Sequence, residues 1–593
     1  IMCGIVGGVG NFDIRSYIIE GLKSLDYRGY DSAGIALKTA NKVWVYKTVG
    51  RVEQLEAKTP EIEGVTLGIG HTRWATHGAP TEENCHPQQS MYGKFTIVHN
   101  GVIENFRELK NRLMDEGYTF VSETDTEVIA NLIDEKYAIA KKNTLEAIRL
   151  AIAELKGSFA LAIIKRSSDH KIYFAKRHSP LLIGVGEGSN YLASDAVPMI
   201  KKCSKFIDLE NDQYGYISEK EVVVLKDGKK VPLRYTERNA ELLNRDLGNY
   251  PHYMLKEIEE APMCIQRLID NYFDGKKYLF SNELMNALEN ADNIIFLACG
   301  TSYYASLMGK YYMESLGKRS EAYIASEWAY YPHFGGKNPI FIFVSQSGET
   351  ADLIRCMQLV KEHNCKSITI TNTKGSSLER EATYSLLLYA GVEVAVASTK
   401  AYSAQVALLA LLKGAYENNF DVVDDLIVAK EALKKIEEMK EDFHFIARRI
   451  KDKKNIFFLG RGLDYNLCLE GSLKLKEITY IHSEAFPGGE LKHGPIALIE
   501  KGTPVFGYIS DEKTAMPLRA NYQEVKARGA EVISIVSASL KNDTDTIVVP
   551  DAPYYLCSLV KVMVAQYIAY YTALELGCDI DKPRNLAKSV TVE

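Results

Sequence analysis

The pattern of apolar and polar residues differs between the first and the second part of the chain. In the first 238 residues, short apolar strands come first, amphipathic helices follow, and strands return. One of these helices, over residues 145–155, places Leu145, Ile148, Ile152 and Leu155 on a single face. Strands, then helices, then strands again predict a layered α+β domain that contains two sheets.

A polar stretch over residues 239–246 has no strand pattern and is predicted to be a linker. Beyond it, strands and helices alternate, which predicts a parallel sheet. This second region repeats: residues 293–300 resemble 455–462, and the strands that follow correspond in the same order. Two tandem copies of one doubly wound α/β unit explain the repeat. The predicted divisions are 1–238, the linker, 247–425, 426–580 and a tail over 581–593.

Composition narrows the class of protein. Hydrophobic residues make up 46% of the chain and charged residues 25%, as in ordinary soluble proteins. A net charge of −6 gives no electrostatic case for binding nucleic acid or an anionic membrane. The ten cysteines form no CxxC motif, which argues against a zinc site or a disulfide framework and fits a reducing cytoplasm. The N-terminus lacks the pattern of a signal peptide, and the most apolar helical stretch, 401–412, is too short to span a bilayer.

Cys3 begins a predicted buried strand of glycines and β-branched residues. If the residues before it are removed, Cys3 carries both a thiol and a free α-amine that can take the thiol proton near neutral pH. A cysteine near a chain start is more often a small buried residue. Ile1 and Met2 precede Cys3 here, and if both remain on the protein, the amide-cleaving half is expected to be inactive. The hypothesis is that ammonia released from an amide at Cys3 is used elsewhere in the chain.

Hydroxyl-rich turns join strands to helices in the first repeat. The clearest is Ser345-Gln346-Ser347-Gly348-Glu349-Thr350, and similar turns lie at 299–302 and 397–400. Free amides at a helix N-terminus suit a phosphate, although a simply capped helix gives the same pattern. The sequence therefore predicts a phosphorylated ligand at the carboxyl edge of this sheet. It contains no GxxxxGK[ST] loop, and Gly460-Arg461-Gly462 is only weak evidence for NAD.

Glu470, Lys474 and Glu477 share one face of a predicted helix. A solvated charged face is the default interpretation. His493, between glycine and proline, is predicted to lie in a turn, and with Glu477 it could move protons on a sugar. The spacing of His71, His77 and His86 matches no usual metal-binding pattern, so no metal is expected.

Six motifs together give a specific resemblance that runs essentially end to end. The chain resembles the isomerising glutamine–fructose-6-phosphate aminotransferase family in Cys-Gly-Ile-Val-Gly from residue 3, Tyr-Arg-Gly-Tyr-Asp-Ser from 27, His-Thr-Arg-Trp-Ala-Thr-His-Gly from 71, His-Asn-Gly from 99, Ser-Gln-Ser-Gly-Glu-Thr from 345, and the tail 582–593. The first four occur widely among amidotransferases, and the last two point to this family. The resemblance implies an N-terminal-nucleophile glutaminase domain (αββα) followed by two tandem sugar isomerase (SIS) domains.

The resemblance also implies roles for individual residues of the first domain. Cys3 would attack the glutamine amide, and Asn100 and Gly101 would form the oxyanion hole. Arg73 would pair with the α-carboxylate of glutamine, and Asp125 would hold its α-ammonium group. The remaining glutamine-site residues by resemblance are Arg28, Trp74, Thr76 and His77.

In the second half, Lys588 resembles the lysine that forms a Schiff base with the open-chain ketose, which only a neutral lysine can do. Without the resemblance, a lysine so near the end would be taken as an exposed tail residue. Glu477 would move a proton between the sugar carbons C1 and C2, His493 would help to open the ring, and Glu470 and Lys474 would support them. The implied sugar-phosphate set is Thr301, Ser302, Ser345, Gln346, Ser347, Thr350, Val396, Ser398 and Ala587.

The leading hypothesis is a cytoplasmic homodimer that makes glucosamine 6-phosphate from L-glutamine and D-fructose 6-phosphate, with no redox cofactor or metal, and that channels ammonia between its two sites. In the family, the histidine at position 493 comes from the neighbouring subunit. One alternative is an amidotransferase for a different sugar phosphate. Another is a sugar-phosphate sensor with an inert N-terminal domain, which persistence of Ile1 and Met2 would favour.

Overall fold

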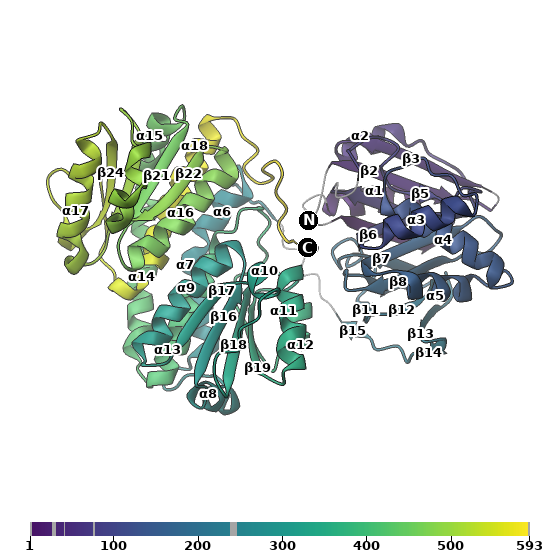
Figure 1. The fold of residues 1–593 in the computed structure, drawn as a ribbon, viewed down its shortest axis with the longest axis horizontal. Coiled ribbons are helices and arrows are strands. Elements are labelled where there is room, and N and C mark those ends of the chain that lie inside the picture. The colour runs from purple at the N-terminus through teal and green to yellow at the C-terminus, as the bar shows by residue number, and fades with distance from the viewer. Residues whose placement is uncertain (1–2, 26–30, 41, 75–77, 238–245, 591–593) are drawn as a thin grey trace. The chain divides into compact units, whose positions relative to one another are not determined.

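The computed structural model describes residues 3–25, 31–40, 42–74, 78–237 and 246–590. The chain forms two compact units, Ile1–Arg245 with Ser589–Glu593, and Asp246–Lys588 (Figure 1). The predicted linker, 239–246, lies outside the described residues except for Asp246. The predicted divisions at 238 and 580 stay predictions, and the one between residues 425 and 426 falls inside helix α14 (Asp421–Glu437).

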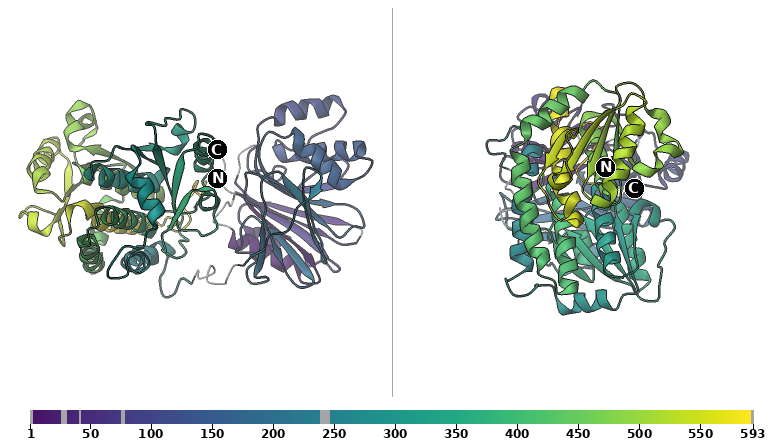
Figure 2. Two further views of the ribbon diagram at one scale, coloured as in Figure 1. Left: turned by 90° about the horizontal axis from the view of Figure 1, so that it is seen from below. Right: turned by 90° about the vertical axis from the view of Figure 1, so that its left-hand side faces the viewer.

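The first unit has four layers. Its two antiparallel sheets, of eight and seven strands, pack face to face through an apolar layer that includes Ile5, Ile69 and Phe174. Helices α1 and α2 pack on the outer face of the first sheet, and α3, α4 and α5 pack on that of the second. The sheets lie between the helical layers in Figure 2. The predicted αββα arrangement is therefore confirmed.

The elements of the first unit follow the apolar pattern of the sequence. Asp13 caps α1, because its side chain accepts the backbone N–H of Ser16 at 3.0 Å. The helices are α1 (Ile14–Ser24), α2 (Val52–Lys58), α3 (Phe106–Asp115), α4 (Asp125–Ile139) and α5 (Thr144–Glu154). The strands are β1 (Gly4–Gly10), β2 (Ser32–Lys38), β3 (Val43–Val49), β4 (Leu67–Arg73), β5 (Gln88–Gln89), β6 (Phe95–Ile103), β7 (Gly157–Lys165), β8 (Ile172–Arg177), β9 (Leu182–Val185), β10 (Ser189–Ala193), β11 (Lys205–Asp208), β12 (Gln213–Ile217), β13 (Val222–Lys226), β14 (Lys229–Lys230) and β15 (Thr236–Glu237).

Strand β6 is longer than its apolar run predicts. Its first residues, 95–98, are mostly apolar, and polar residues follow at 99 and 100, but β6 continues to Ile103. It pairs with β7 from Phe95 opposite Lys165 to Ile103 opposite Gly157. The ladder of backbone hydrogen bonds continues through polar residues because their partners on β7 are in register. Asn100 and Gly101 therefore lie within a sheet, where a rigid backbone holds them.

The second unit contains the predicted repeat. Two five-stranded parallel sheets have the same strand order, β17-β16-β18-β19-β20 and β22-β21-β23-β24-β25. The three matched stretches of sequence form corresponding strands: β16 with β21, β18 with β23, and β19 with β24. The two tandem doubly wound domains are thus confirmed.

The bounds of the second unit complete the fold. Its strands are β16 (Asn293–Ala298), β17 (Ser320–Ile324), β18 (Pro339–Ser345), β19 (Lys366–Thr371), β20 (Tyr384–Leu387), β21 (Asn455–Gly460), β22 (His482–Pro487), β23 (Pro504–Ile509), β24 (Glu531–Ser537) and β25 (Ile547–Val549). Its other α-helices are α6 (Tyr253–Glu259), α7 (Ala261–Tyr272), α8 (Asn282–Glu289), α9 (Gly300–Ser315), α10 (Ala325–Trp328), α11 (Ala351–Glu362), α12 (Ser377–Glu381), α13 (Lys400–Glu417), α15 (Lys440–Ile450), α16 (Leu463–Thr479), α17 (Glu512–Lys526) and α18 (Cys557–Glu575).

One hydrophobic core joins the two repeats. A single cluster of buried residues runs from Met254 in α6 through Leu408 in α13 to Ile568 in α18. The segment 554–575, which contains α18, is long and apolar enough to cross a membrane, but 94% of its apolar window is buried inside the protein. It is a core helix, and it is longer than the 401–412 stretch that the sequence singled out.

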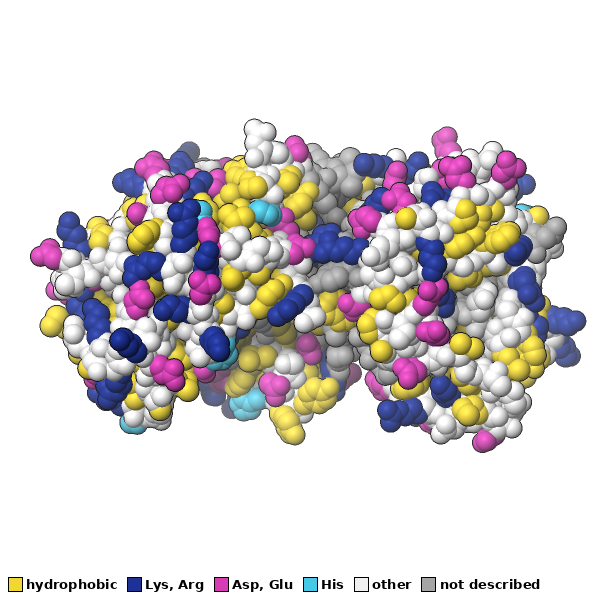
Figure 3. Space-filling model, turned by 90° about the horizontal axis from the view of Figure 1, so that it is seen from above, with side chains coloured by type: hydrophobic (Ala, Val, Ile, Leu, Met, Phe, Trp, Pro, Cys, Tyr) yellow, Lys and Arg dark blue, Asp and Glu magenta, His cyan; other side chains and the backbone are white. Residues whose placement is uncertain are grey.

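Charges of both signs mix on the surface. On the face drawn in Figure 3, the lysine and arginine side chains are interspersed with aspartate and glutamate, and neither sign forms a separate field. This distribution agrees with the small net charge of −6.

Candidate functional site

Cys3 lies at the start of β1, beside the end of β4. Its sulfur accepts the backbone N–H of Trp74 at 3.2 Å and lies 3.7 Å from the Trp74 carbonyl oxygen. Burial raises the pKa of the Cys3 thiol to about 11, although the Trp74 N–H and the charge of Arg73 oppose the rise. The thiol is therefore protonated at neutral pH, and a base must remove its proton before it can act as a nucleophile.

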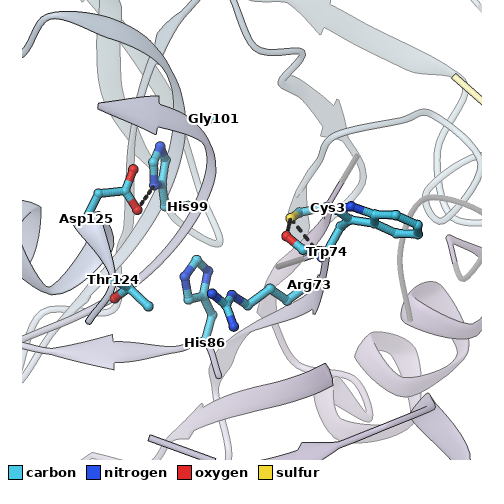
Figure 4. Close-up of a pocket in the computed structure, with 8 residues that line it drawn as sticks. All are labelled: Cys3, Arg73, Trp74, His86, His99, Gly101, Thr124 and Asp125. Carbon is cyan, nitrogen blue, oxygen red and sulfur yellow. Dashed lines mark hydrogen bonds and ion pairs between the residues drawn. The ribbon is translucent and has the colours of Figure 1, made fainter. Parts of the chain in front are cut away.

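A pocket opens beside this sulfur. Its lining comes from β4, β6, the start of α4 and the loop before β5, and comprises Cys3, Arg73, Trp74, His86, His99, Gly101, Thr124 and Asp125. Figure 4 shows Cys3 and Asp125 on opposite sides of it. Five residues predicted for the glutamine site thus meet at one pocket: Cys3, Gly101, Arg73, Trp74 and Asp125. Arg28, Thr76 and His77 lie outside the described residues.

Asn100 and Gly101 meet Cys3 from β6. The side-chain amide of Asn100 donates to the Cys3 carbonyl oxygen at 2.8 Å, which leaves a second amide hydrogen for another acceptor. Gly101 has φ +136°, and a Cβ atom there would lie 2.1 Å from the Ser158 carbonyl oxygen. Only glycine fits this position, so the backbone beside the thiol depends on it.

Charged groups of the pocket are held by backbone atoms. The guanidinium of Arg73, only 3% exposed, donates to the Gly78 carbonyl oxygen at 3.2 Å. Asp125 begins α4, and its carboxylate accepts the Ile103 N–H at 3.0 Å. A buried cation and a buried anion in one pocket complement the two charged ends of an amino acid.

Sequence reasoning missed three residues of the pocket lining, His86, His99 and Thr124. His99 lay inside the quoted His-Asn-Gly motif, and His86 was considered only as a metal ligand. Among the described residues, no cluster of three or more histidine, cysteine, aspartate or glutamate residues is suited to hold a metal. The signal that could have identified the three missed residues was that they are polar and lie within or near a motif.

The hydroxyl-rich turn of the first repeat lies where predicted, between β18 and α11. Ser345 accepts the Gly348 N–H at 3.0 Å, and Ser347 accepts the Glu349 N–H at 3.2 Å. Thr350 is the N-cap residue of α11, without a side-chain cap hydrogen bond. Gln346 is half-buried in the same turn. Because Thr350 forms no cap, its hydroxyl and the first amides of α11 are placed to meet an anion.

The predicted charged face of α16 is buried, so the interpretation of it as a solvated surface is wrong for Glu470 and Lys474, both 0% exposed. Lys474 contacts Glu477 at 2.5 Å and Glu470 at 3.6 Å, and it donates to the Thr301 hydroxyl at 3.0 Å. Burial raises the pKa of Glu470 to about 8. Burial alone lowers the pKa of Lys474, but Glu470 and Glu477 outweigh it and raise it to about 12.

Lys588 is enclosed, with a side chain only 5% exposed. Its ammonium group forms an ion pair with Glu393 and donates to the Ser398 hydroxyl at 3.0 Å. Glu393 also accepts the N–H groups of Thr399 and Ala401 at the start of α13, at 3.0 and 3.1 Å. Despite burial, the charge of Lys588 and these hydrogen bonds lower the pKa of Glu393 to about 2. Sequence reasoning missed Glu393.

The remaining predicted sugar-site residues surround these clusters. Thr301 also reaches Glu470, at 3.3 Å, and Ser302 accepts the side-chain amide of Gln405 at 2.9 Å. The Val396 N–H donates to the Asp581 carbonyl oxygen at 2.9 Å, which ties the loop of Ser398 to the tail that carries Lys588. Ala587 is half-buried next to Lys588. The charge of Glu393 also contributes to the raised pKa of Lys474, so the two charged clusters interact electrostatically.

His493 stands apart from both clusters. It ends a 3₁₀ segment, Gly488–His493, rather than a simple turn, and it is exposed. None of the hydrogen bonds or ion pairs found among the described residues joins it to Glu477 or Lys588. Within the described part of a single chain, His493 therefore makes no direct polar contact with either residue.

The second repeat fills its corresponding sheet edge with its own side chains. Lys561, buried in α18, donates to the Ile509 carbonyl oxygen at 2.7 Å and to the hydroxyls of Ser510 and Ser537. Buried Asp464 accepts the Ser510 N–H at 2.9 Å. These strand ends match those that carry Ser345 and Thr371 in the first repeat, so an internal cation stands where the first repeat presents hydroxyls.

A thiol pocket in a layered α+β unit, joined to two α/β units, defines a glutamine amidotransferase domain with a pair of SIS domains. The glutamine amidotransferase domain family matches residues 71–201, and the SIS domain family matches 287–413 and 449–576. Curated proteins named glutamine–fructose-6-phosphate aminotransferase (isomerizing) from Geobacillus kaustophilus and Bacillus subtilis are 46% and 44% identical over 602 residues, with 100% of each chain covered.

A solved structure agrees for the second half. The C-terminal domain of glucosamine-fructose-6-phosphate aminotransferase from Francisella tularensis is 33% identical, with a TM-score of 0.54, and covers 56% of this chain and 99% of its own. The chain belongs to the isomerizing glutamine–fructose-6-phosphate aminotransferase family, and it is an enzyme.

Proposed function

We propose that this enzyme transfers the amide nitrogen of L-glutamine to D-fructose 6-phosphate, giving L-glutamate and D-glucosamine 6-phosphate. The observation that carries the proposal is the presence, in one chain, of two separate buried sites of suitable chemistry. One has a thiol in a pocket that also holds a buried cation and a buried anion, and the other has an enclosed lysine beside buried carboxylates. The proposal is supported by 46% sequence identity, over the full length of both chains, to a relative named glutamine–fructose-6-phosphate aminotransferase.

In the glutaminase half, the sulfur of Cys3 attacks the side-chain carbonyl carbon of glutamine. A thioester forms, ammonia leaves, and water then releases glutamate. The second amide hydrogen of Asn100 and the backbone at Gly101 face the oxygen on which charge develops. Arg73 pairs with the α-carboxylate and Asp125 with the α-ammonium group. The family resemblance assigns Arg28, Trp74, Thr76 and His77 to glutamine binding as well. Because the thiol is protonated at rest, the α-amine of a trimmed Cys3 is the proposed base.

In the isomerase half, the turn from Ser345 to Thr350 binds the phosphoryl group through hydroxyls and helix amides, with Thr301, Ser302 and Ser398 nearby. Lys588 first gives a proton to the Glu393 carboxylate beside it, and the neutral amine then attacks the ketone carbon C2 of the open-chain sugar and forms an imine with loss of water. Ammonia then replaces the lysine nitrogen at C2. Glu477 carries a proton from C1 to C2, and Glu470 and Lys474 hold Glu477 in place.

Two finer features belong to the same proposal. His493 is exposed, which supports a homodimer in which each subunit lends His493 to the other for ring opening. Ammonia passes internally between the sites, in a cytoplasmic protein. The internal passage of ammonia follows from the family and not from the described contacts.

Labelled glutamine tests the proposal directly. With amide-¹⁵N glutamine, fructose 6-phosphate and a tenfold excess of unlabelled ammonium, mass spectrometry should find glucosamine 6-phosphate that carries ¹⁵N. Cys3→Ala should abolish this product but spare the conversion of hexose phosphates. Glutamine hydrolysis without any aminosugar product would refute the proposed acceptor, and unlabelled product would refute internal transfer.

A further inference from the structure

A chain of buried side chains connects the two ends of the thiol pocket. Asn100 Oδ1 lies 3.0 Å from His71 Nε2, and the same nitrogen lies 3.2 Å from His86 Nδ1. His86 Nε2 then lies 3.0 Å from the Thr126 hydroxyl oxygen. That hydroxyl reaches His99 Nδ1 at 3.1 Å and Asp125 Oδ1 at 3.5 Å. The relay, as we call His71, His86 and Thr126, thus links Asn100 with Asp125.

The orientation of the Asn100 amide follows from its neighbours. On one side it faces the Cys3 carbonyl oxygen, which can only accept a hydrogen bond. Its NH₂ group must therefore point to Cys3, and its Oδ1 must point away, towards His71. An NH₂ group on this side is what a developing oxyanion at the thiol requires.

The same reasoning fixes the protons of both histidines. His71 Nε2 lies 2.9 Å from the His99 carbonyl oxygen as well as near Asn100 Oδ1, and both are acceptors, so Nε2 carries the hydrogen. His86 Nδ1 faces that hydrogen and must accept, which leaves the His86 hydrogen on Nε2 to donate to Thr126. The hydroxyl hydrogen of Thr126 is then left for His99 or Asp125.

We propose that His71 is a positioning residue for glutamine hydrolysis, because its Nε2–H holds Asn100 Oδ1 and so aims the Asn100 NH₂ group at the oxyanion. His86 and Thr126 act through it by fixing the ring of His71. The inference rests on the glutaminase activity proposed above. It adds residues that act on this activity by positioning Asn100 and not by binding glutamine.

Burial supports a relay of fixed direction. His71 is 0% exposed and His86 is 5% exposed. Burial lowers the pKa of His71 to about 3, and burial with the neighbouring charges lowers that of His86 well below its usual range. Both rings are therefore neutral across the working pH range, and each keeps one donor and one acceptor.

A double-mutant cycle between His71 and Asn100 tests the proposal in the full-length chain. We expect His71→Ala to lower kcat for glutamine hydrolysis by about 10–100-fold, less than the loss of an oxyanion donor itself, and to change KM by less than about threefold. In an Asn100→Ala background, the same change should cost less than about twofold, because the group that it positions is gone. His71→Gln, whose amide can donate to Asn100, should recover most of the rate.

Controls separate this inference from other failures. Sugar isomerisation and the unfolding midpoint of each variant report whether the protein is intact, and His170→Ala, at an exposed histidine, should leave kcat unchanged. A full loss from His71→Ala in the Asn100→Ala background would overturn the inference while leaving the proposed function in place. Hydrolysis that survives Cys3→Ala would instead overturn the proposed function.

Discussion

The ammonium nitrogen of Lys588 lies 3.0 Å from the hydroxyl oxygen of Ser398, and the Glu393 carboxylate bonds to both. Glu393 in turn accepts two backbone N–H groups at the start of α13. The carboxylate therefore fastens a tail lysine to a rigid helix end, where partial positive charge favours the anion.

Replacing Glu393 with glutamine should loosen this arrangement. The amide keeps the size of the side chain but leaves the ammonium of Lys588 without its counter-charge, and breaking a buried ion pair typically costs about 3–5 kcal/mol. We expect slower fructose 6-phosphate conversion, by at least about tenfold, and faster hydrogen exchange over residues 581–590. Glu289→Gln, at an exposed position, is the control. Unchanged exchange in the tail would show that Glu393 does not hold it.

Gly101→Ala should destabilise the protein and disable glutamine hydrolysis, because the new Cβ atom would displace the backbone beside the thiol. Gly101 has φ +136° and would place a Cβ 2.1 Å from the Ser158 carbonyl oxygen, whereas Gly117 has φ +91° and open space around it. Gly117→Ala therefore meets only the conformational penalty, about 1 kcal/mol or somewhat more, and Gly101→Ala meets the clash as well. Denaturant melts of both variants measure the difference, and equal destabilisation would contradict the predicted clash.

Glu470→Gln should flatten the pH dependence of stability. Burial raises the pKa of folded Glu470 from 4.5 to about 8, so the folded state holds a proton that the unfolded state has lost between those values. Unfolding then releases a proton, and the free energy of unfolding falls as pH rises from about 4.5 to 8. The glutamine variant lacks this slope. Chemical denaturation at pH 5, 7 and 9 tests it, and identical slopes in both proteins would rule out Glu470 as the source.

Lys561→Met should destabilise the second repeat by about 3–5 kcal/mol, because it leaves the Asp464 carboxylate buried without a cation. Adding Asp464→Asn should recover most of the loss, since the amide can still accept the Ser510 N–H. Lys513→Met, on the exposed face of α17, is the matched control. If Lys561→Met and Lys513→Met melt alike, the buried ammonium does not balance Asp464.

Local patterns sufficed for much of this molecule. The repeat was readable because β16 and β21 share an apolar run and a following glycine turn. The residues that the family resemblance assigned to glutamine, among them Cys3, Gly101, Arg73 and Asp125, do gather at one pocket. Recognising the repeat and the motifs does not require contacts that only the folded chain creates.

The missed residues depend on such contacts. Glu393 belongs to no motif and meets Lys588 across 195 positions. The contact between His71 and Asn100, which are 29 positions apart, was hidden in the same way although Asn100 itself was predicted. The burial of Glu470 and Lys474 was also hidden, because a charged helix face looks the same in sequence whether water or another domain covers it.

The shared apolar interior of the two SIS repeats limits how this enzyme can be dissected. Met254, Leu408 and Ile568 belong to the same cluster although they come from the beginning, the middle and the end of the second unit. Separating the two SIS repeats would expose a large apolar surface on each fragment, so each repeat on its own should aggregate. A minimal isomerase fragment should therefore begin before α6 and continue through Lys588.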